Sequence, residues 1–598
     1  MQPPGERAVL LVFAALLAGL VAMQLLYVTR LGADVLYMDS LRLLIQIEEW
    51  RRGEISLARL WGLDGSQHRG LLFHGVLMAN AQLTGLDVAT ANRATALVLG
   101  AFAGITGWTF LRSTAVAAAG SAAQALRLLV AACIAGICFS LAGYEVLTLE
   151  MGLALWLKNL LFVLYFLLHE RVLRDGRAGW SAVAMLAGPA IVLLVAMGWS
   201  YAFAAAVAGV HVLVILFDRQ GRRFAQWLPT AVLLGTLVLY ATSRNATGQS
   251  AMGAEALQAG MLLKGLALVP HAVGSAVVSS DAARAYGLGT SLLPLAGYLL
   301  LAAAAWGLFV RTRRGLLSGS LLPLYMIAYG SVFALSVCIV RGDAGADFVA
   351  ASRYYMDLLM LPIGVLWLLA EQALVSRGRS AKAASSLASS LLLATLLLSL
   401  AGTQWREWKY LLPQRALGFE AMRAATLAGV PDQNSADMLQ SPLPHARGGV
   451  DILRRKGWSL FMHVPASQRL VECERPVMQG PGWHALEASG TWMAQQATLE
   501  LPACTCAHEL DVYIPPGFST RQLSVSGGAF ADGKSFALEP GVAVSIDFPA
   551  SSTPVTYALA TSAVTVPARD VPGAGDAREL AAQWFYSRID CVPASAAP

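Results

Sequence analysis

Acidic residues stand near the ends of several long apolar runs, where a carboxylate could act on a substrate at a membrane surface. Asp39 follows the first run, in the stretch "LYMDSLRLLIQ". Glu145 and Glu150 lie in the short gap between two later runs. Ionisable groups at a membrane are costly and tend to mark function. A carboxylate there suits general-base catalysis, in which it removes a proton from a hydroxyl group. We therefore take these three residues as candidate catalytic residues.

Cations near the same runs suit the binding of phosphate. His68 and Arg69, in the stretch "QHRG", place an imidazole beside a guanidinium, although such a pair is also common in a solvated turn. Lys158 falls about two turns inside a predicted span, where a buried ammonium calls for an anionic partner or ligand. Its structural alternatives are an ion pair with Glu150 or a side chain that reaches outward to the interface.

A third stretch, "VRGDAGADFVAASRYYMDLLM", joins arginines to aromatic residues around one predicted loop. Arg341 and Arg353 could hold a phosphate or pyrophosphate while Tyr354 or Tyr355 stacks against a sugar. The alternative is that the tyrosines and arginines only anchor the chain at the membrane interface.

Asp39 also has a structural alternative. It precedes residues with helical apolar spacing, so it could be the carboxylate at the start of the helix that it opens. Ser40 is equally available as the cap. The sequence alone leaves both roles of Asp39 open.

The elements that must position these residues are membrane spans. The chain has 598 residues, of which 56% are hydrophobic and 13% charged, and its mean hydropathy is +0.57. This composition indicates an α-helical polytopic membrane protein. About eleven apolar runs have the length of a span, including a first run that we interpret as a retained span and not a signal peptide. They lie near 8–28, 92–111, 128–143, 152–168, 181–197, 201–217, 226–242, 289–310, 316–340, 355–375 and 384–402.

Arginine and lysine gather in every second loop, which predicts that those loops are cytoplasmic. With an odd number of spans, the opposite, outer side then receives 31–91, 143–151, 243–288, 341–354 and everything after about residue 403. All the candidate residues except Lys158 fall in or beside these outer segments. The net charge of +6 is scattered between apolar runs and forms no stripe, which argues against nucleic acid as a partner.

The composition changes after residue 402, so we expect three parts: a membrane domain over 1–402 with the external loop 31–91, a helical membrane-proximal linker over 403–460, and a β-rich domain over 461–598. The last part contains short alternating stretches such as "ATLELPA", "HELDVYIP" and "VAVSIDFPA". They predict a small extracytoplasmic β-sandwich-like domain. No Walker loop, nucleophile elbow, His-Glu-x-x-His or dinucleotide motif occurs in the chain.

Four cysteines fall in this outer tail and suggest two disulfide bonds. Cys504 and Cys506 are separated by one residue and would strain if bonded to each other, so each should pair with Cys473 or Cys591, which leaves two connectivities. A zinc site is the alternative, but the "CTC" spacing does not favour it.

Taken together, "YMDS", "QHRG", "FSLAGYEVLTLEMG" and "SRYYMD" resemble the motifs of a group of bacterial multi-span proteins that are similar to GT-C glycosyltransferases. The resemblance covers roughly residues 8–402. It implies a polyprenyl-phosphate-linked sugar as donor, a glycan or lipid of the cell envelope as acceptor, and a site at the outer face of the bacterial inner membrane. It also implies that Asp39, in the first external loop, is the base.

The resemblance has one departure. Many GT-C members carry a second acid beside the first, whereas Ser40 follows Asp39 here. Glu145 or Glu150 could supply that acid, and a divalent metal ion stays possible. Two alternative functions are a glycan polymerase or ligase of the O-antigen type that uses undecaprenyl pyrophosphate, and a non-enzymatic flippase or transporter of lipid-linked sugars.

Overall fold

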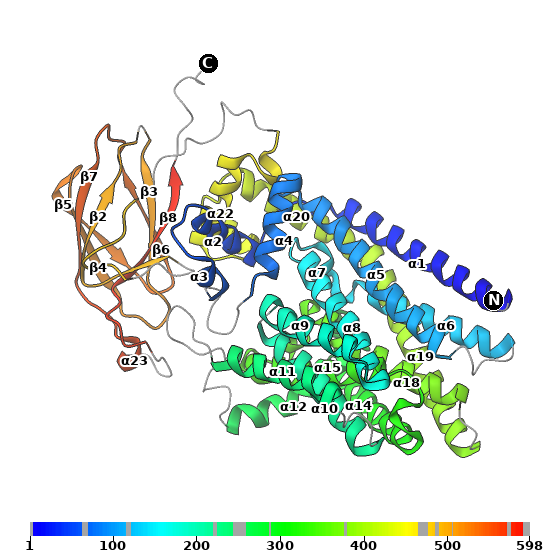
Figure 1. Cartoon of the computed structure of the whole chain (residues 1–598). Helices are drawn as coiled ribbons and strands as arrows, with labels where there is room; N and C mark the ends of the chain where they lie inside the picture. Colours follow the sequence, from blue (N-terminus) through cyan, green and yellow to red (C-terminus); the bar gives the residue numbers. More distant parts are fainter. Residues whose placement is uncertain are drawn as a thin grey trace.

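The structure is a computed structural model of the chain, in which a helical bundle carries a separate β-domain (Figure 1). It describes residues 4–62, 70–114, 121–195, 197–218, 224–242, 259–285, 287, 289–375, 379–463, 476–484, 490–504, 506–570 and 576–589. Within these residues, nine helices are long and apolar enough to cross a membrane, or ten if one bent pair counts as a span. The chain is therefore a multi-pass membrane protein with a C-terminal antiparallel β-domain.

The spans run back and forth between two ends of the bundle. The long helices are α1 (Pro4–Leu31), α5 (Val88–Thr114), α6 (Ser121–Cys138), α8 (Gly152–Asp175), α9 (Ala178–Val195), α10 (Met197–Phe217), α14 (Gly289–Arg314), α15 (Leu322–Arg341) and α19 (Arg379–Arg406). The bent pair joins α16 (Ala346–Val349) and α17 (Tyr355–Leu358) to α18 (Met360–Val375) with a 50° bend. The arginine-rich loops lie at the end away from the β-domain, which we call the basic end; the other is the β-domain end (Figure 1).

Among the described residues, nine or ten helices have the length and hydropathy of a span, whereas the sequence led us to expect about eleven. The run at 226–242 forms α11 (Phe224–Thr242), but its apolar part is the shorter helix Gln226–Thr242. This part is one residue shorter than α9, which places it at the lower limit of the length of a span.

The segment 243–288, which we expected to be an external loop, contains a helix of the bundle. Residues Ala259–Ser275 form α12, which packs along α14 and α15. Glycines on both sides permit this approach, because a Cβ at Gly265 would lie 3.0 Å from the Ile339 Cα and one at Gly274 would collide with the Leu293 carbonyl. Lys264 and Pro270 interrupt the apolar run, so its hydropathy did not predict a span.

The first external loop and the linker after α19 form a helical layer over the β-domain end. The loop contains α2 (Asp39–Arg51), α3 (Leu57–Gly62) and α4 (Leu72–Thr84); the linker contains α20 (Leu412–Leu427), α21 (Gln433–Met438) and α22 (Leu443–Lys456), and the short α7 (Tyr144–Thr148) and α13 (Ser280–Ala285) lie between spans. Arg423 of α20 pairs with Asp34 at 2.7 Å, and α2 packs against α22. Segments that are far apart in sequence therefore meet at this end.

The β-domain consists of two four-stranded antiparallel sheets. One has the order β1 (Thr491–Met493), β8 (Ala582–Ile589), β3 (His508–Tyr513) and β6 (Ala543–Phe548); the other has the order β2 (Gln496–Leu501), β7 (Val555–Thr561), β4 (Arg521–Gly527) and β5 (Phe530–Leu538), and a short helix, α23 (Pro567–Asp570), precedes β8. Leu510 and Trp584 of the first sheet share one buried core with Leu499 and Tyr557 of the second. Alternate residues of β2 are buried, which is the pattern that predicted a strand there.

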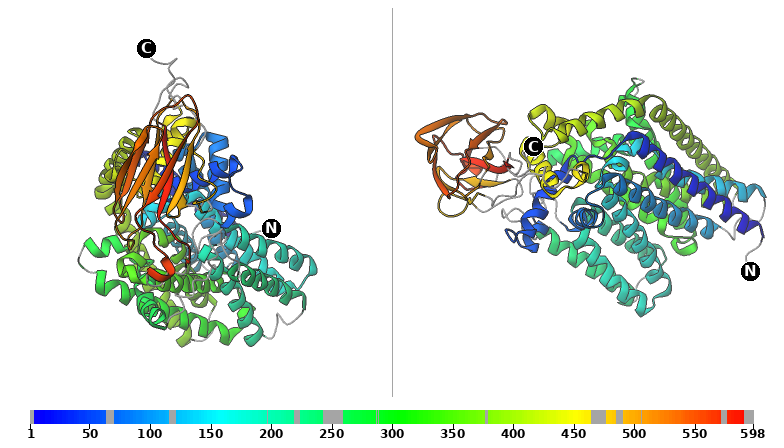
Figure 2. Two further views of the ribbon diagram at one scale, coloured as in Figure 1. Left: turned by 90° about the vertical axis from the view of Figure 1, so that its left-hand side faces the viewer. Right: turned by 90° about the horizontal axis from the view of Figure 1, so that it is seen from above.

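Arg447 fastens the β-domain to the linker. This buried side chain of α22 contacts Asp511 at 3.0 Å and Glu509 at 3.1 Å, both on β3. Its Nε also donates to the carbonyl of Val430, 2.9 Å away. Figure 2 (right) shows the linker helices and the first loop between the β-domain and the membrane spans. The linker thus holds both the first loop and the β-domain.

Candidate functional site

Asp39 is the first residue of α2 and lies at the β-domain end. Its side chain is 61% exposed and pairs with Arg42 at 3.2 Å. Met38 occupies the N-cap position and makes no side-chain cap hydrogen bond, so neither Asp39 nor Ser40 caps this helix. The Asp39 carboxylate still benefits from the helix dipole, because it lies in the first turn. It remains accessible to a ligand.

The backbone just before Asp39 is strained. Met38 has φ 58° and ψ −138°, a conformation that costs a residue with a side chain of order 1–3 kcal/mol. The Met38 N–H donates to the Leu439 carbonyl, 2.8 Å away, after α21. Strain of this kind persists only where the surroundings enforce it, and it clusters at active sites. The linker therefore fixes the point from which Asp39 projects.

His445 of α22 is a member of the site that sequence reasoning missed. Burial lowers its pKa to about 4, and the positive charge of Arg42 adds to this effect while Asp39 opposes it. Its ring lies edge-on to Phe585 of β8, with 5.9 Å between centroids. Its Nε2 has no hydrogen-bond partner within the described residues. A neutral imidazole with an open nitrogen thus stands near an exposed carboxylate.

Glu150 lies beneath the start of α2. Ser40 donates a hydrogen bond from Oγ to the Glu150 Oε2, 3.2 Å away, and both side chains are buried. Burial raises the pKa of Glu150 to about 7, an effect that the Ser40 hydrogen bond partly opposes. Asp39 and Glu150 thus form an exposed and a buried carboxyl group on either side of Ser40.

Arg341, Arg353 and Glu145 converge on Tyr354. All three charges act on the Tyr354 hydroxyl, and the Arg353 guanidinium lies 4.9 Å from the Phe348 ring centroid and 5.9 Å from that of Tyr354. In the described part of the chain, the buried Oε2 of Glu145 and Nε of Arg353 have no hydrogen-bond partner. Four of the predicted residues therefore gather, and two of them, Glu145 and Arg353, have unused hydrogen-bonding capacity.

Tyr37 connects this group to Asp39 along the chain. Its ring packs edge-on against Phe419 of α20, 5.9 Å away, and burial raises the pKa of its hydroxyl, which faces Thr148 and senses the charge of Glu145. Asp39 follows two residues later, at most about 7 Å along an extended backbone. The two groups therefore belong to one end of the bundle and to adjoining elements.

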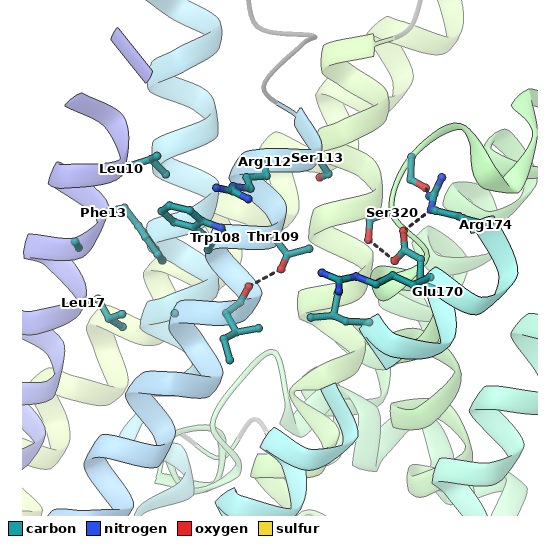
Figure 3. Close-up of a pocket in the computed structure, with 16 residues that line it drawn as sticks. Leu10, Phe13, Leu17, Trp108, Thr109, Arg112, Ser113, Glu170, Arg174 and Ser320 are labelled. Atoms are coloured by element: carbon teal, nitrogen blue, oxygen red, sulfur yellow. Dashed lines mark hydrogen bonds and ion pairs between the residues drawn. The ribbon is translucent and has the colours of Figure 1, made fainter. Parts of the chain in front are cut away.

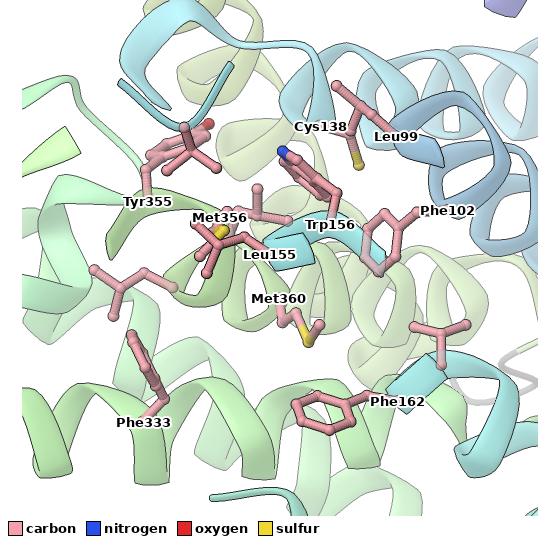
Figure 4. Packing of buried hydrophobic residues seen from close by; sticks show 14 of the residues in the cluster. Leu99, Phe102, Cys138, Leu155, Trp156, Phe162, Phe333, Tyr355, Met356 and Met360 are labelled. Carbon is pink, nitrogen blue, oxygen red and sulfur yellow. The ribbon is translucent and has the colours of Figure 1, made fainter. Parts of the chain in front are cut away.

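Tyr355 does not join Tyr354 at this site. It is 8% exposed, and its hydroxyl donates to the Ile137 carbonyl at 3.3 Å. Figure 4 shows it in the apolar core with Trp156, Cys138 and Met356. Of the two tyrosines, only Tyr354 therefore lies beside Arg341, Arg353 and Glu145.

Lys158 is fully buried in the bundle and its partner is Asp357, not Glu150. The Nζ and Oδ1 atoms are 2.6 Å apart, and Tyr329 donates to the same oxygen at 2.7 Å. The ammonium also lies 4.0 Å from the ring centroid of Trp199. The charge of Lys158 is thus already neutralised, so a donor phosphate would have to displace Asp357 to reach it.

A second arginine site at the same end was also missed. Arg415 of α20 binds Glu407 through two 3.0 Å contacts and lies 3.1 Å from the ring centroid of Tyr144. It borders a cavity of about 580 Å³ that Asp281, Arg284, Arg406, Leu411 and Gln414 also line. Sequence reasoning gave no signal here, because these residues come from helices that it treated as a loop and a linker.

The remaining predicted residues fall into two classes. His68, Arg69, Cys473 and Cys591 lie outside the described residues. Cys504 and Cys506 are both disulfide-bonded. As for a metal ion, the described residues contain no group of three or more His, Cys, Asp or Glu side chains that could hold one.

No family model, no curated protein and no solved structure matches this chain. What the chain does must therefore be inferred from its own residues. Among the described ones, the β-domain end combines an exposed carboxylate, a buried carboxyl group with a raised pKa, and two arginines beside a tyrosine.

Proposed function

We propose that the chain transfers a sugar from a polyprenyl-phosphate donor to a glycan or lipid acceptor of the cell envelope, with inversion at the anomeric carbon. The observation that carries this proposal is the exposed Asp39 carboxylate at the start of α2. Arg341, Arg353 and Tyr354 lie at the same end of the bundle. A base and cations at one membrane surface are what transfer from a lipid phosphate requires.

The reaction is a single displacement. Asp39 removes the proton from an acceptor hydroxyl, whose oxygen forms a bond to the anomeric carbon. The bond from that carbon to the phosphate oxygen breaks, and polyprenyl phosphate leaves with the electron pair. Arg341 and Arg353 neutralise the charge that develops on the phosphate, while Tyr354 packs against the sugar. The leaving group needs no proton, so one base is sufficient.

Glu150 and His445 support Asp39 from two sides. The hydrogen bond from Ser40 to Glu150 ties the first turn of α2 to the segment between α7 and α8. His445 is held neutral by burial, so its open Nε2 can accept or donate a hydrogen bond without a competing charge. We assign both as positioning residues for Asp39 and the acceptor hydroxyl.

The interior of the bundle favours transfer over transport. Lys158 and Asp357 form an ion pair in which both side chains are fully buried. His169 is likewise bonded through Nδ1 to the Tyr325 hydroxyl at 2.7 Å and through Nε2 to the Thr230 hydroxyl at 2.9 Å. A transporter needs polar groups that can exchange partners along a route. These groups bind one another, which suits a rigid scaffold.

The experiment is a transfer assay with purified protein in nanodiscs. A panel of polyprenyl-phosphate hexoses with a labelled sugar is offered together with an envelope lipid extract as acceptor. We expect label to move to an acceptor and polyprenyl phosphate to be released in equal amount. The proposal is wrong if no donor yields product and the protein binds polyprenyl phosphate no better than the uncharged polyprenol.

A further inference from the structure

A groove opens at the basic end of the bundle, at the opposite end from Asp39. Its volume is about 850 Å³, and it lies between α1, α5 and α8 beside Gly319 and Ser320 (Figure 3). Apolar side chains from the first turns of α1 and the last turns of α5 form much of its wall. These residues are Leu10, Phe13, Ala14, Leu17, Ile105 and Trp108.

Two arginines at the groove have no acidic partner among the described residues. The Arg112 guanidinium lies 4.6 Å from the ring centroid of Trp108, and that of Arg171 lies 5.0 Å from the ring centroid of Trp180. Both side chains are exposed, and neither forms an ion pair with a described carboxylate. Stacking on an aromatic ring orients a guanidinium but leaves its charge uncompensated.

The third arginine of the groove shows the contrast. Arg174 pairs with Glu170 at 2.8 Å and donates to the carbonyls of Leu317, at 2.8 Å, and Gly319. The other oxygen of Glu170 accepts from the Ser320 hydroxyl at 2.9 Å. This acid is therefore fully engaged, and the groove keeps the charges of Arg112 and Arg171.

The charged and apolar parts follow each other along the span direction. Arg112 lies near the last residue of α5, whereas the lining of α1 extends from Leu10 to Leu17. Seven residues of helix cover about 10 Å. A phosphate at the arginines would thus lie at the membrane surface. The apolar wall of the groove beneath it is about as long as half an acyl chain.

We propose that this groove binds one anionic phospholipid of the adjoining leaflet. The phosphate lies between Arg112 and Arg171, and an acyl chain runs along α1 and α5. The occupant is a lipid because the wall below the arginines is apolar, and it is anionic because the two charges are unmatched. The positive-inside rule leads us to expect the cytoplasmic leaflet. The site is independent of sugar transfer.

The test is native mass spectrometry of the detergent-solubilised full chain, titrated with phosphatidylglycerol or with phosphatidylcholine of the same acyl chains. We expect one phosphatidylglycerol to bind at least roughly tenfold more tightly, because each arginine near a membrane surface contributes about fivefold to anionic lipid binding. The variant Arg112→Gln/Arg171→Gln should bind both lipids equally. Each single variant should lose part of the preference, so the result does not depend on the double variant folding.

Arg313→Gln is the matched control. Arg313 is also exposed at the end of α14 and lies 5.2 Å from the ring centroid of Phe309, but it does not line the groove. This variant should keep the full preference. If it loses the preference as strongly as the double variant does, the effect comes from net charge and the proposed site is wrong.

Ala14→Trp tests the apolar part, because Ala14 is exposed in the groove wall. This variant should weaken the binding of both lipids while the ratio between them persists. Glycerol phosphate, which has the headgroup charge without the chains, should not compete at equal concentration. Equal competition by glycerol phosphate, or no preference in the wild type, would overturn the proposal.

Discussion

The charges in the middle of the bundle and those at its β-domain end are arranged in opposite ways. Lys158 and Asp357 are completely buried and form an ion pair at 2.6 Å. The Tyr329 hydroxyl donates a hydrogen bond to the same oxygen of Asp357. Asp39 is 61% exposed, and Arg353 keeps a buried nitrogen without a hydrogen-bond partner among the described residues. The first arrangement is a neutralised pair shut off from solvent, although the Asp357 Oδ2 has no hydrogen-bond partner among the described residues. The second includes an exposed carboxylate that a ligand can reach.

This difference helps to distinguish a structural role from a functional role for a charged residue in a membrane protein. An intramembrane charge is a functional candidate by default, and Lys158 was predicted on that basis. A buried counter-ion shifts the interpretation towards architecture, since the ion pair joins α8 to the bent helix pair. The solvent exposure of the Asp39 carboxylate and the backbone strain at Met38 shift it towards function.

The buried pair should give the largest effect when one member is changed. Asp357→Asn keeps an acceptor for Tyr329 but leaves the Lys158 ammonium without a counter-ion, so we expect a loss of about 3–5 kcal/mol in the free energy of unfolding. The double variant Lys158→Met/Asp357→Asn should recover most of it. Denaturation in mixed micelles measures both. A single variant as stable as the wild type would mean that the pair does not support the fold.

Glu150 should produce a pH dependence of stability with a defined sign. Its pKa is raised from 4.5 to about 7 in the folded state, so between these values the folded chain holds a proton that the unfolded chain releases. The contribution of Glu150 therefore falls as pH rises from about 4.5 to about 7, by roughly 3 kcal/mol.

Glu150→Gln should remove this slope, because Gln can still accept the hydrogen bond from Ser40. The measurement is the free energy of unfolding at pH 5 and at pH 8. Glu48→Gln is the control, since the pKa of Glu48 is lowered by Lys456 and Arg52 against the opposing effect of burial and its titration lies below this window. An unchanged slope in the Glu150→Gln variant would show that Glu150 is ionised throughout.

Arg353 should matter for the donor and not for the fold. Arg353→Gln removes one phosphate contact, so the affinity for polyprenyl phosphate should fall roughly tenfold, the effect of about one charge-assisted hydrogen bond. Arg284→Gln changes an arginine at the same end that is paired with Asp281, and it should leave the affinity within about twofold. Equal losses in both variants would point to general electrostatic attraction.

Substitutions of the two adjacent tyrosines should affect different properties, and the expected loss of donor affinity is the smallest of the functional effects predicted. Tyr354→Leu should lower donor affinity about two- to fivefold through lost stacking and leave stability nearly unchanged. Tyr355→Leu should lower stability, because its ring is buried in the core. Titration with a polyprenyl-phosphate hexose and thermal unfolding compare them. A larger loss of affinity for the Tyr355→Leu variant would place the sugar elsewhere.

Features that depend on composition and on the local spacing of apolar residues were predicted from the sequence. Contacts between segments that are distant in sequence were missed. The spans and the alternation in β2 follow from hydropathy. Sequence reasoning overlooked α12, because Lys264 and Pro270 interrupt the apolar run. The glycines of α12 nevertheless allow this helix to pack closely against α14 and α15. Glu145, Arg341 and Arg353 were found through their position beside spans. His445 and Asp357 could not be assigned to their partners, since those contacts join segments more than a hundred residues apart.

The most direct test of the central claim is the transfer rate of Asp39→Asn in nanodiscs. Asn keeps the shape of the side chain but removes its basicity, so we expect a fall of roughly 100- to 10,000-fold in turnover with donor binding retained. Asp34→Asn, which changes the nearby acid that pairs with Arg423, should stay within about threefold of the wild type. Activity of Asp39→Asn within that same threefold would contradict the account and remove Asp39 from the mechanism.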